Sequence, residues 1–323
     1  MVVLRHVLFG QSRSFIVKNL ISVVVLSWLC FPASLFAYEA QSFSSLAPRW
    51  QYLVNRLAQD GLSDPAVVAL FASLPATHTQ SPMGRKILAL YKKKFFPSRT
   101  IKKTDYYKGV VSEKNARTCK DYLEEHRASF EKAWERYSVP PAIAVSLLFV
   151  ETRLGTVLAD VPENAFYTLA SMAASRTPHD IASWLPKMRG YKKRLDWIEK
   201  TMRARAEWAY TETKALVQYM MANAIDPKAL PSSIYGAVGL CQFMPSNIAL
   251  YGADGDGDGR IDLFQIEDAT MSLAKYLAKH GWKRDLTRDQ QHALLMKYNH
   301  SKMYANTILA LADQIMLLDS KKP

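Results

Sequence analysis

Apolar residues recur at steps of three and four positions through most of this 323-residue chain, and this helical period restricts its fold more than any other feature. Residues 112–137 show the pattern clearly. Cys119, Tyr122 and Phe130 fall on one face of that segment, whereas charged residues occupy the other. No alternating run of apolar and polar residues is long enough to indicate a large sheet. The sequence therefore predicts an all-α protein.

The same period predicts further helices along the chain. They cover residues 46–60, 64–73, 82–94, 207–222, 268–280 and 301–317. The pattern breaks over residues 96–108, a stretch with Pro97 and many lysines that has the composition of a linker. We therefore expect an N-terminal helical segment over residues 38–108, packed on a main body over residues 109–323.

The first 37 residues have the composition of an export signal. Arg5, Arg13 and Lys18 precede an apolar run over residues 20–37 that ends at the small residue Ala37. The run is nearly long enough to span a bilayer, so an anchor that is not cleaved stays open. A buried N-terminal helix is the other interpretation. We expect the protein in the periplasm or cell envelope, anchored to the inner membrane if the segment is retained.

The net charge limits the classes of partner that the protein can bind, and the cysteines limit its metal chemistry. The chain has 42 Lys and Arg against 29 Asp and Glu, a formal charge of +13, which suits anionic polymers or membrane surfaces. We expect no nucleic-acid partner, because no helix-turn-helix or RNA-binding signature accompanies the charge. Cys119 and Cys241 belong to no metal-binding cluster, and we expect two buried thiols, with a disulfide as the alternative.

Glu151 is a carboxylate in an apolar setting. Pro140 and Pro141 suit the start of a helix, and the residues that follow are apolar on almost every face, so that helix should be buried. Glu151 shares a face with Leu147 and lies in the last turn. Burial and the negative end of the helix both disfavour its charged form, which predicts a raised pKa and a possible proton donor. A surface Glu paired with an Arg is the alternative.

Four phrases occur in one order along the chain: VPPAIAVSLLFVETRLG at 139–155, YGAVGLCQFMPSN at 235–247, DGDGDGRIDLF at 254–264 and KYNHSKMYA at 297–305. With them the sequence resembles the lytic murein transglycosylase B family from about residue 47 to residue 315. The resemblance implies a lysozyme-like helical fold. It also implies cleavage of the bond between N-acetylmuramic acid and N-acetylglucosamine in peptidoglycan without water, which leaves a 1,6-anhydro ring.

The resemblance assigns a role to Glu151 as the sole catalytic carboxylate, acting first as acid and then as base. It implies a hydrogen bond from Ser233 to Glu151. It also implies a substrate-binding group that comprises Ser233, Gln242, Tyr298, Asn299, Tyr304 and Arg205. Cys241 stands where the family usually has Gly. Without the resemblance, the two tyrosines would be interpreted as core aromatics, and Gln242 and Asn299 as turn or capping residues.

The Asp/Gly-rich loop 254–265 follows the EF-hand spacing and predicts a calcium site. The expected ligands are Asp254, Asp256, Asp258, the Arg260 carbonyl, Asp262 and, at position twelve, Gln265. A carboxylate is usual at position twelve, so the Gln predicts weak binding of Ca²⁺ with a structural role. The resemblance supports a metal here, and a solvated Gly/Asp turn is the alternative.

A basic amphipathic helix is expected over residues 185–203, within a stretch from Ser171 to Arg205 that is longer than the family pattern. It suits contact with acidic peptide stems or an anionic membrane surface, although an extra packed helix with a solvated basic face explains it more simply. A hydrolytic muramidase of the same fold and a non-catalytic peptidoglycan-binding protein remain alternative functions. We expect a monomer.

Overall fold

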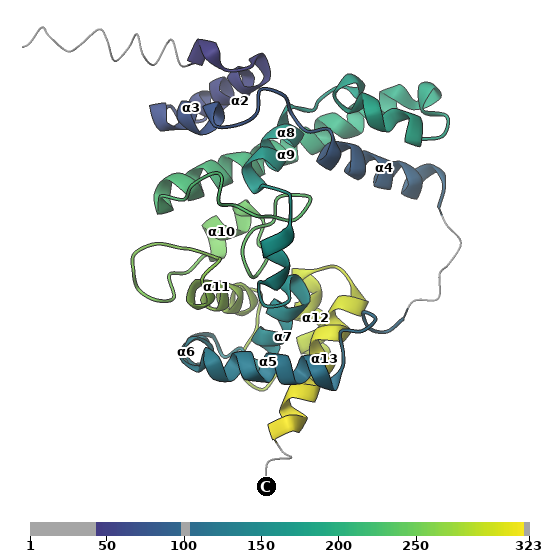
Figure 1. Ribbon diagram of the computed structural model, residues 1–323. Helices are drawn as coiled ribbons and strands as arrows, with labels where there is room; N and C mark the ends of the chain where they lie inside the picture. The colour runs from purple at the N-terminus through teal and green to yellow at the C-terminus, as the bar shows by residue number, and fades with distance from the viewer. Residues whose placement is uncertain (1–42, 98–103, 320–323) are drawn as a thin grey trace, which may run out of the picture.

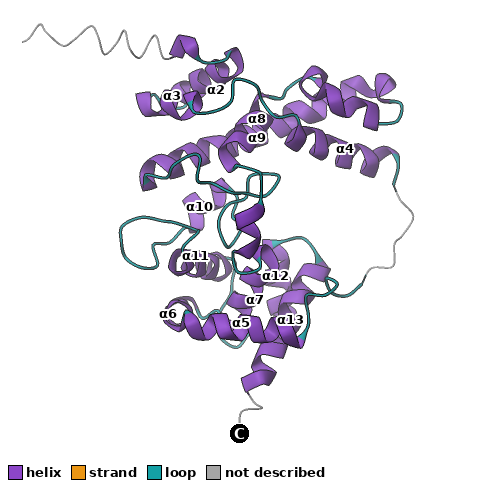
Figure 2. Cartoon of the chain, viewed as in Figure 1, coloured by secondary structure: helices purple, strands orange, loops and turns teal. Residues whose placement is uncertain are grey.

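The computed structural model describes residues 43–97 and 104–319, and these residues form an all-helical molecule (Figure 1 and Figure 2). Within them no strand is present, only three isolated bridges that pin the segment 231–243. The α-helices are α2 (Pro48–Gln59), α3 (Pro65–Ala72), α4 (Ser81–Phe95), α5 (Glu113–Glu125), α6 (Arg127–Tyr137), α7 (Pro141–Thr152), α8 (Ala165–Ala174), α9 (Leu195–Asn223), α10 (Pro245–Tyr251), α11 (Ile266–Lys279), α12 (Arg288–Tyr298) and α13 (Lys302–Asp319). Three 3₁₀ segments join them: η1 (Thr156–Asp160), η2 (Pro178–Lys187) and η3 (Tyr191–Arg194). The predicted all-α class is confirmed.

The helices pack as two groups, one above the other in Figure 1. In the upper group, α2 and α4 pack on α8, and α8 lies along the long helix α9. In the lower group, α5, α6, α11 and α13 surround α7. Helix α10 contacts both α9 and α11, so it joins the groups, together with loops 224–244 and 252–265. The N-terminal helices therefore pack on helices of the expected main body. The proposed signal at 1–37 lies outside the described residues.

Helix α7 is the centre of the lower group. Its residues from Ala142 to Phe149 are all buried, which is the environment that its apolar sequence demands. The described residues contain one helical stretch, Pro141–Asp160, with the length and hydropathy of a membrane span. Half of it is buried by neighbouring helices, as in the core of a folded domain. After Thr152 the chain leaves the helix through Arg153, Leu154 and Gly155, all with positive φ.

Two of the helices expected from the sequence are interrupted in the structure, so these two predictions were wrong. The segment 112–137 is two helices that meet at His126, whose φ of −110° and ψ of 30° are not helical. Apolar spacing continues on both sides of this single residue, so the sequence period does not reveal the break. The expected basic helix 185–203 is also broken, because Pro186 and the left-handed Gly190 (φ 72°) end the regular backbone. Its second half instead begins α9, which continues through the predicted helix 207–222.

Candidate active site and metal loop

The carboxyl group of Glu151 lies at the end of α7, with restricted access to solvent. Burial raises its pKa to about 7, and the hydroxyl of Tyr304, which donates a hydrogen bond of 2.5 Å to Oε1, limits the increase. No ion pair joins Glu151 to a basic side chain in the described part of the chain. The raised pKa predicted from the leucine-rich helix is therefore confirmed in direction, and the group can carry a proton near neutral pH.

Two tyrosines pack beside this carboxyl group. Tyr304, in the first turn of α13, and Tyr298, the last residue of α12, stack with ring centroids 6.3 Å apart. Tyr298 donates a hydrogen bond to the backbone carbonyl of Cys241. Burial raises the pKa of both hydroxyls well above the usual value, so both remain neutral donors. Helices α12 and α13 thus bring one donor to Glu151 and one to the loop beside it.

The loop 239–244 is fixed against α7. Thr152, the neighbour of Glu151 in sequence, donates its hydroxyl to the Leu240 carbonyl at 3.0 Å. Gly239 leaves no room for a side chain, because a Cβ there would collide with Leu263. Gln242 adopts a left-handed φ of 52°, a conformation that costs free energy for a non-Gly residue and that the surrounding bonds must hold. Its side-chain amide donates to the Gly239 carbonyl at 3.0 Å. Sequence reasoning missed Thr152 as the link between the two motifs.

Ser233 does not make the expected contact. Its hydroxyl accepts hydrogen bonds from the backbone N–H groups of Tyr235 (3.3 Å) and Ala237 (3.1 Å) and forms none with Glu151 in this structure. The expected hydrogen bond is absent from this structure, because Ser233 starts a tight turn whose backbone N–H groups hold its hydroxyl within its own loop. Tyr304 instead supplies the hydrogen bond to Glu151.

The remaining predicted substrate residues lie at accessible positions. Asn299 is exposed at the C-terminal end of α12, where its backbone N–H bonds to Leu295. Arg205 is half-buried on α9. Burial, together with the charge of Arg205, lowers the pKa of Lys86, whose ammonium lies 4.0 Å from the ring centroid of Tyr235. Arg205 and Lys86 are thus two neighbouring cations from different helices, and neither forms an ion pair with a described acidic residue.

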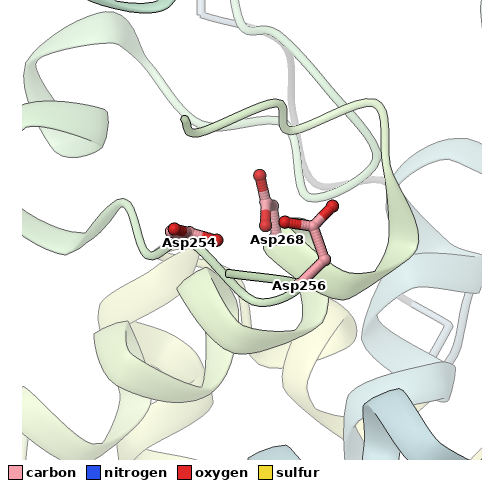
Figure 3. A group of neighbouring side chains, drawn as sticks. All are labelled: Asp254, Asp256 and Asp268. Atoms are coloured by element: carbon pink, nitrogen blue, oxygen red, sulfur yellow. The ribbon is translucent and has the colours of Figure 1, made fainter. Parts of the chain in front are cut away.

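A second group of carboxylates lies in the loop before α11 (Figure 3). One oxygen from each of Asp254, Asp256 and Asp268 lies within 4.8 Å of the others. Asp254 accepts hydrogen bonds from Gly257 and Gly259, and these backbone donors lower its pKa. Three carboxylates at this separation repel one another unless a cation lies between them. Hard oxygen donors on a Gly-rich loop fit Ca²⁺.

Asp268 is the member of this group that the EF-hand count missed. It is buried and accepts hydrogen bonds from the backbone N–H groups of Gly255 and Asp262, both at 2.6 Å. Burial, and then the charges of Asp256 and Asp254, raise its pKa. Gln265, at the twelfth position, is exposed at the N-cap of α11. The helix begins later than the twelve-residue spacing assumes, and its first turn presents Asp268 to the loop.

The other predicted ligands keep local hydrogen bonds within the loop. Asp258 accepts from the N–H of Arg260, and Asp262 accepts from the N–H of Phe264. Lys132 of α6 donates to the carbonyl of Gly255 and places a positive charge at the edge of the group.

The two cysteines among the described residues are both buried. Cys119 and Cys241 are free thiols, as expected, and no disulfide joins them.

The chain is similar to proteins of known family. Residues 45–291 match the family described as "Transglycosylase SLT domain". The chain is 28% identical to the membrane-bound lytic murein transglycosylase B of Escherichia coli (strain K12) over 233 residues, which are 72% of this chain and 53% of that protein. It therefore spans about half the length of this relative.

Solved structures share the fold. The structure of Escherichia coli lytic transglycosylase Slt35 in complex with calcium has a TM-score of 0.60 at 20% identity, covering 85% of this chain and 95% of that one. The structure of SltB3 from Pseudomonas aeruginosa in complex with NAG-anhNAM-pentapeptide has a TM-score of 0.59 at 17% identity, covering 83% of this chain and 79% of that one. The lysozyme-like helical architecture expected from the resemblance is confirmed.

Proposed function

This chain belongs to the transglycosylase SLT domain family, and we propose that it is a lytic transglycosylase that cleaves the β-1,4 bond between N-acetylmuramic acid and N-acetylglucosamine in peptidoglycan. The names of its relatives support the reaction and the polymer. The observation that carries the proposal is the environment of Glu151: burial at the end of α7 raises its pKa to about 7, and its hydrogen-bond partner is the neutral hydroxyl of Tyr304 rather than a second carboxyl group. A hydrolase of the usual kind needs two carboxylates around the bond.

One carboxyl group suffices if the substrate supplies the nucleophile. Protonated Glu151 donates its proton to the glycosidic oxygen, and the bond from that oxygen to C1 of the muramic residue breaks. The carbonyl oxygen of the N-acetyl group stabilises the positive charge that develops at C1. The C6 hydroxyl then gives its proton to Glu151 and its oxygen bonds to C1, which closes the 1,6-anhydro ring and restores the protonated enzyme.

The tyrosine hydroxyl supports both steps. The hydrogen bond from Tyr304 holds Oε1 and leaves Oε2 to carry the proton. After proton transfer, the same hydrogen bond stabilises the carboxylate, because a neutral donor favours the charged form of its acceptor. Tyr304 is thus a positioning residue for the general acid. Gln242 and Asn299 offer amide groups to the hydroxyls of the sugar rings.

Three further assignments complete the proposal. Arg205, with Lys86, contacts carboxylates of the peptide stems. The group Asp254, Asp256 and Asp268 holds Ca²⁺ through carboxylate oxygens, and the calcium complex of Slt35 supports this choice of metal. The ion is structural, since it fixes the loop between α10 and α11. The protein acts in the cell envelope after export directed by residues 1–37.

Mass spectrometry of the products from purified peptidoglycan tests the proposed reaction. We expect muropeptides that end in 1,6-anhydromuramic acid. Products heavier by one water would identify a hydrolytic muramidase and contradict the proposal. If folded protein bound to peptidoglycan without releasing products, the non-catalytic alternative would replace it.

A further inference from the structure

Two segments distant in sequence combine into one strongly basic surface. Residues 81–97 and 181–195 together contain ten Lys and Arg and no Asp or Glu. Helix α4 packs against η2, and Figure 1 shows the two lying side by side in the upper group, away from α13. The hydroxyl of Tyr91 donates to the Arg189 carbonyl, and Arg194 donates to the same hydroxyl, both at 2.7 Å. These contacts hold the end of α4 against the turn that leads into α9.

The charged side chains of this surface point to solvent. We define the basic face as six exposed residues: Lys92, Lys93, Lys94, Arg189, Lys192 and Lys193. None of the six forms a side-chain ion pair with a described acidic residue. The nearest acidic residues in sequence are Asp196 and Glu199 at the start of α9, and Glu199 is bound to Arg203. A cluster of this size without acidic partners attracts an extended anionic surface.

Aromatic and apolar groups lie within the same face. Phe96 is 40% exposed and Leu195 is 38% exposed, although both are large hydrophobic residues. The guanidinium of Arg194 lies 5.4 Å from the Phe96 centroid and 4.3 Å from the Phe95 centroid, and Phe95 packs edge to face on Trp197 at 5.1 Å. Charge by itself attracts any polyanion. A lipid surface rewards exposed apolar side chains surrounded by lysines, because the apolar groups enter the boundary below the headgroups.

We propose that the basic face docks on an anionic phospholipid bilayer. The lysines bind the phosphate groups of the lipids, and Phe96 and Leu195 enter the interface between them. The surface differs from the basic amphipathic helix expected from the sequence: that stretch is broken by Pro186 and Gly190, and half of the charge comes from α4. The inference does not depend on the proposed reaction, since lipid binding needs no turnover.

Vesicle co-sedimentation of the full chain tests the proposal. Vesicles of phosphatidylcholine alone are compared with vesicles of phosphatidylcholine and phosphatidylglycerol in equal parts. We expect a preference for the anionic vesicles that weakens as salt is added, because surface charges are screened over about 10 Å at 0.1 M salt. The N-terminal apolar segment is common to every variant, and vesicles of phosphatidylcholine alone measure its own contribution to binding.

Charge reversal with a matched control locates the binding surface. The test variant carries Lys92→Glu, Lys93→Glu, Lys192→Glu and Lys193→Glu. The control variant carries the same number of reversals at exposed lysines elsewhere: Lys108→Glu, Lys228→Glu, Lys283→Glu and Lys302→Glu. Each basic residue at a membrane contributes up to roughly fivefold in binding. We expect the test variant to lose at least tenfold of its anionic preference and the control variant to lose much less.

Two results would overturn the proposal. Equal losses in both variants would mean that vesicles respond only to net charge. Unchanged vesicle binding by the test variant, with reduced binding to purified peptidoglycan, would assign the basic face to the wall polymer. A third measurement distinguishes failure of this inference from failure of the proposed reaction: Phe96→Ser with Leu195→Ser should weaken vesicle binding several-fold while cleavage of soluble peptidoglycan fragments stays unchanged. Unchanged vesicle binding in that variant would contradict insertion.

Discussion

Two sites in this molecule surround carboxyl groups with opposite electrostatic environments. Glu151 is half-buried at the end of an apolar helix, and this burial disfavours its charged form and raises its pKa to about 7. Asp254, Asp256 and Asp268 are clustered, and backbone N–H groups hold them in place. The first environment stores a proton, whereas the second favours a metal ion. The comparison shows that the surroundings, rather than the residue type, decide which chemistry a carboxyl group performs.

Removing the lone carboxyl group gives the largest expected effect. Glu151→Gln should lower the rate of peptidoglycan cleavage by about 10³-fold or more, because the amide can neither donate nor accept the transferred proton. Release of 1,6-anhydro products measures the rate, and circular dichroism checks the fold. Substantial activity in a folded Glu151→Gln protein would remove Glu151 from the mechanism.

The pH dependence of cleavage should report the same group. The acid step needs protonated Glu151, so the rate should fall about tenfold for each pH unit above a pKa of about 7. Stability follows the same sign. The folded state binds the proton more tightly than the unfolded chain, so the free energy of unfolding should fall as pH rises from about 4.5 to 7, by roughly 3 kcal/mol.

Urea unfolding of the wild-type protein and of Glu151→Gln at pH 5 and pH 8 separates this contribution from other groups. The variant lacks the titrating carboxyl group, so its stability should depend less steeply on pH than that of the wild type. Identical pH dependence in the two proteins would mean that Glu151 titrates normally.

The clustered carboxylates should respond to calcium. At a Ca²⁺ concentration about 100-fold above Kd, binding should add about 2.7 kcal/mol to the free energy of unfolding and raise Tm by several degrees. Asp268→Asn should abolish most of the increase, since Asp268 lies within the cluster. Gln265→Ala is the matched control and should retain it. If thermal melting showed the opposite ranking, position twelve would be the ligand.

Removing the hydroxyl of Tyr304 should have a smaller effect on activity than the changes above and a specific effect on the pKa of Glu151. Tyr304→Phe removes the donor to Glu151 Oε1 and should lower the free energy of unfolding by about 1–2 kcal/mol. That hydrogen bond lowers the pKa of Glu151. Its loss should therefore move the alkaline limb of the pH–rate profile to higher pH. A reduced rate with an unmoved limb would mean that Tyr304 contacts only the substrate.

Local sequence predicted the parts of this site that depend on one helix. The apolar faces of residues 139–155 were enough to place Glu151 in a buried last turn and to predict the direction of its pKa shift. The partner of Glu151 was not predictable in this way. Tyr304 lies 153 residues later, and only the packing of α13 on α7 shows that its hydroxyl reaches Oε1.

The sequence-based predictions that the structure contradicts failed because of local backbone conformation. His126 breaks a helix without interrupting the apolar spacing, and Ser233 turns its hydroxyl toward its own loop. The EF-hand count stopped at residue 265, but the carboxylate that joins the cluster comes from the first turn of the following helix. In each case one residue's conformation or one helix boundary changed which groups meet, and a periodic pattern does not register such a change.

Helix α9 gives the molecule a fixed internal length. It begins at Leu195 in the basic face, carries Arg205 further along, and near its end Asn223 accepts a hydrogen bond from the N–H of Ile261 in the metal loop. At about 1.5 Å per residue, its 29 residues span roughly 43 Å without a break. If its first turn lies on a bilayer, α9 fixes the distance between the lipid surface and the metal loop, because an unbroken helix does not change length.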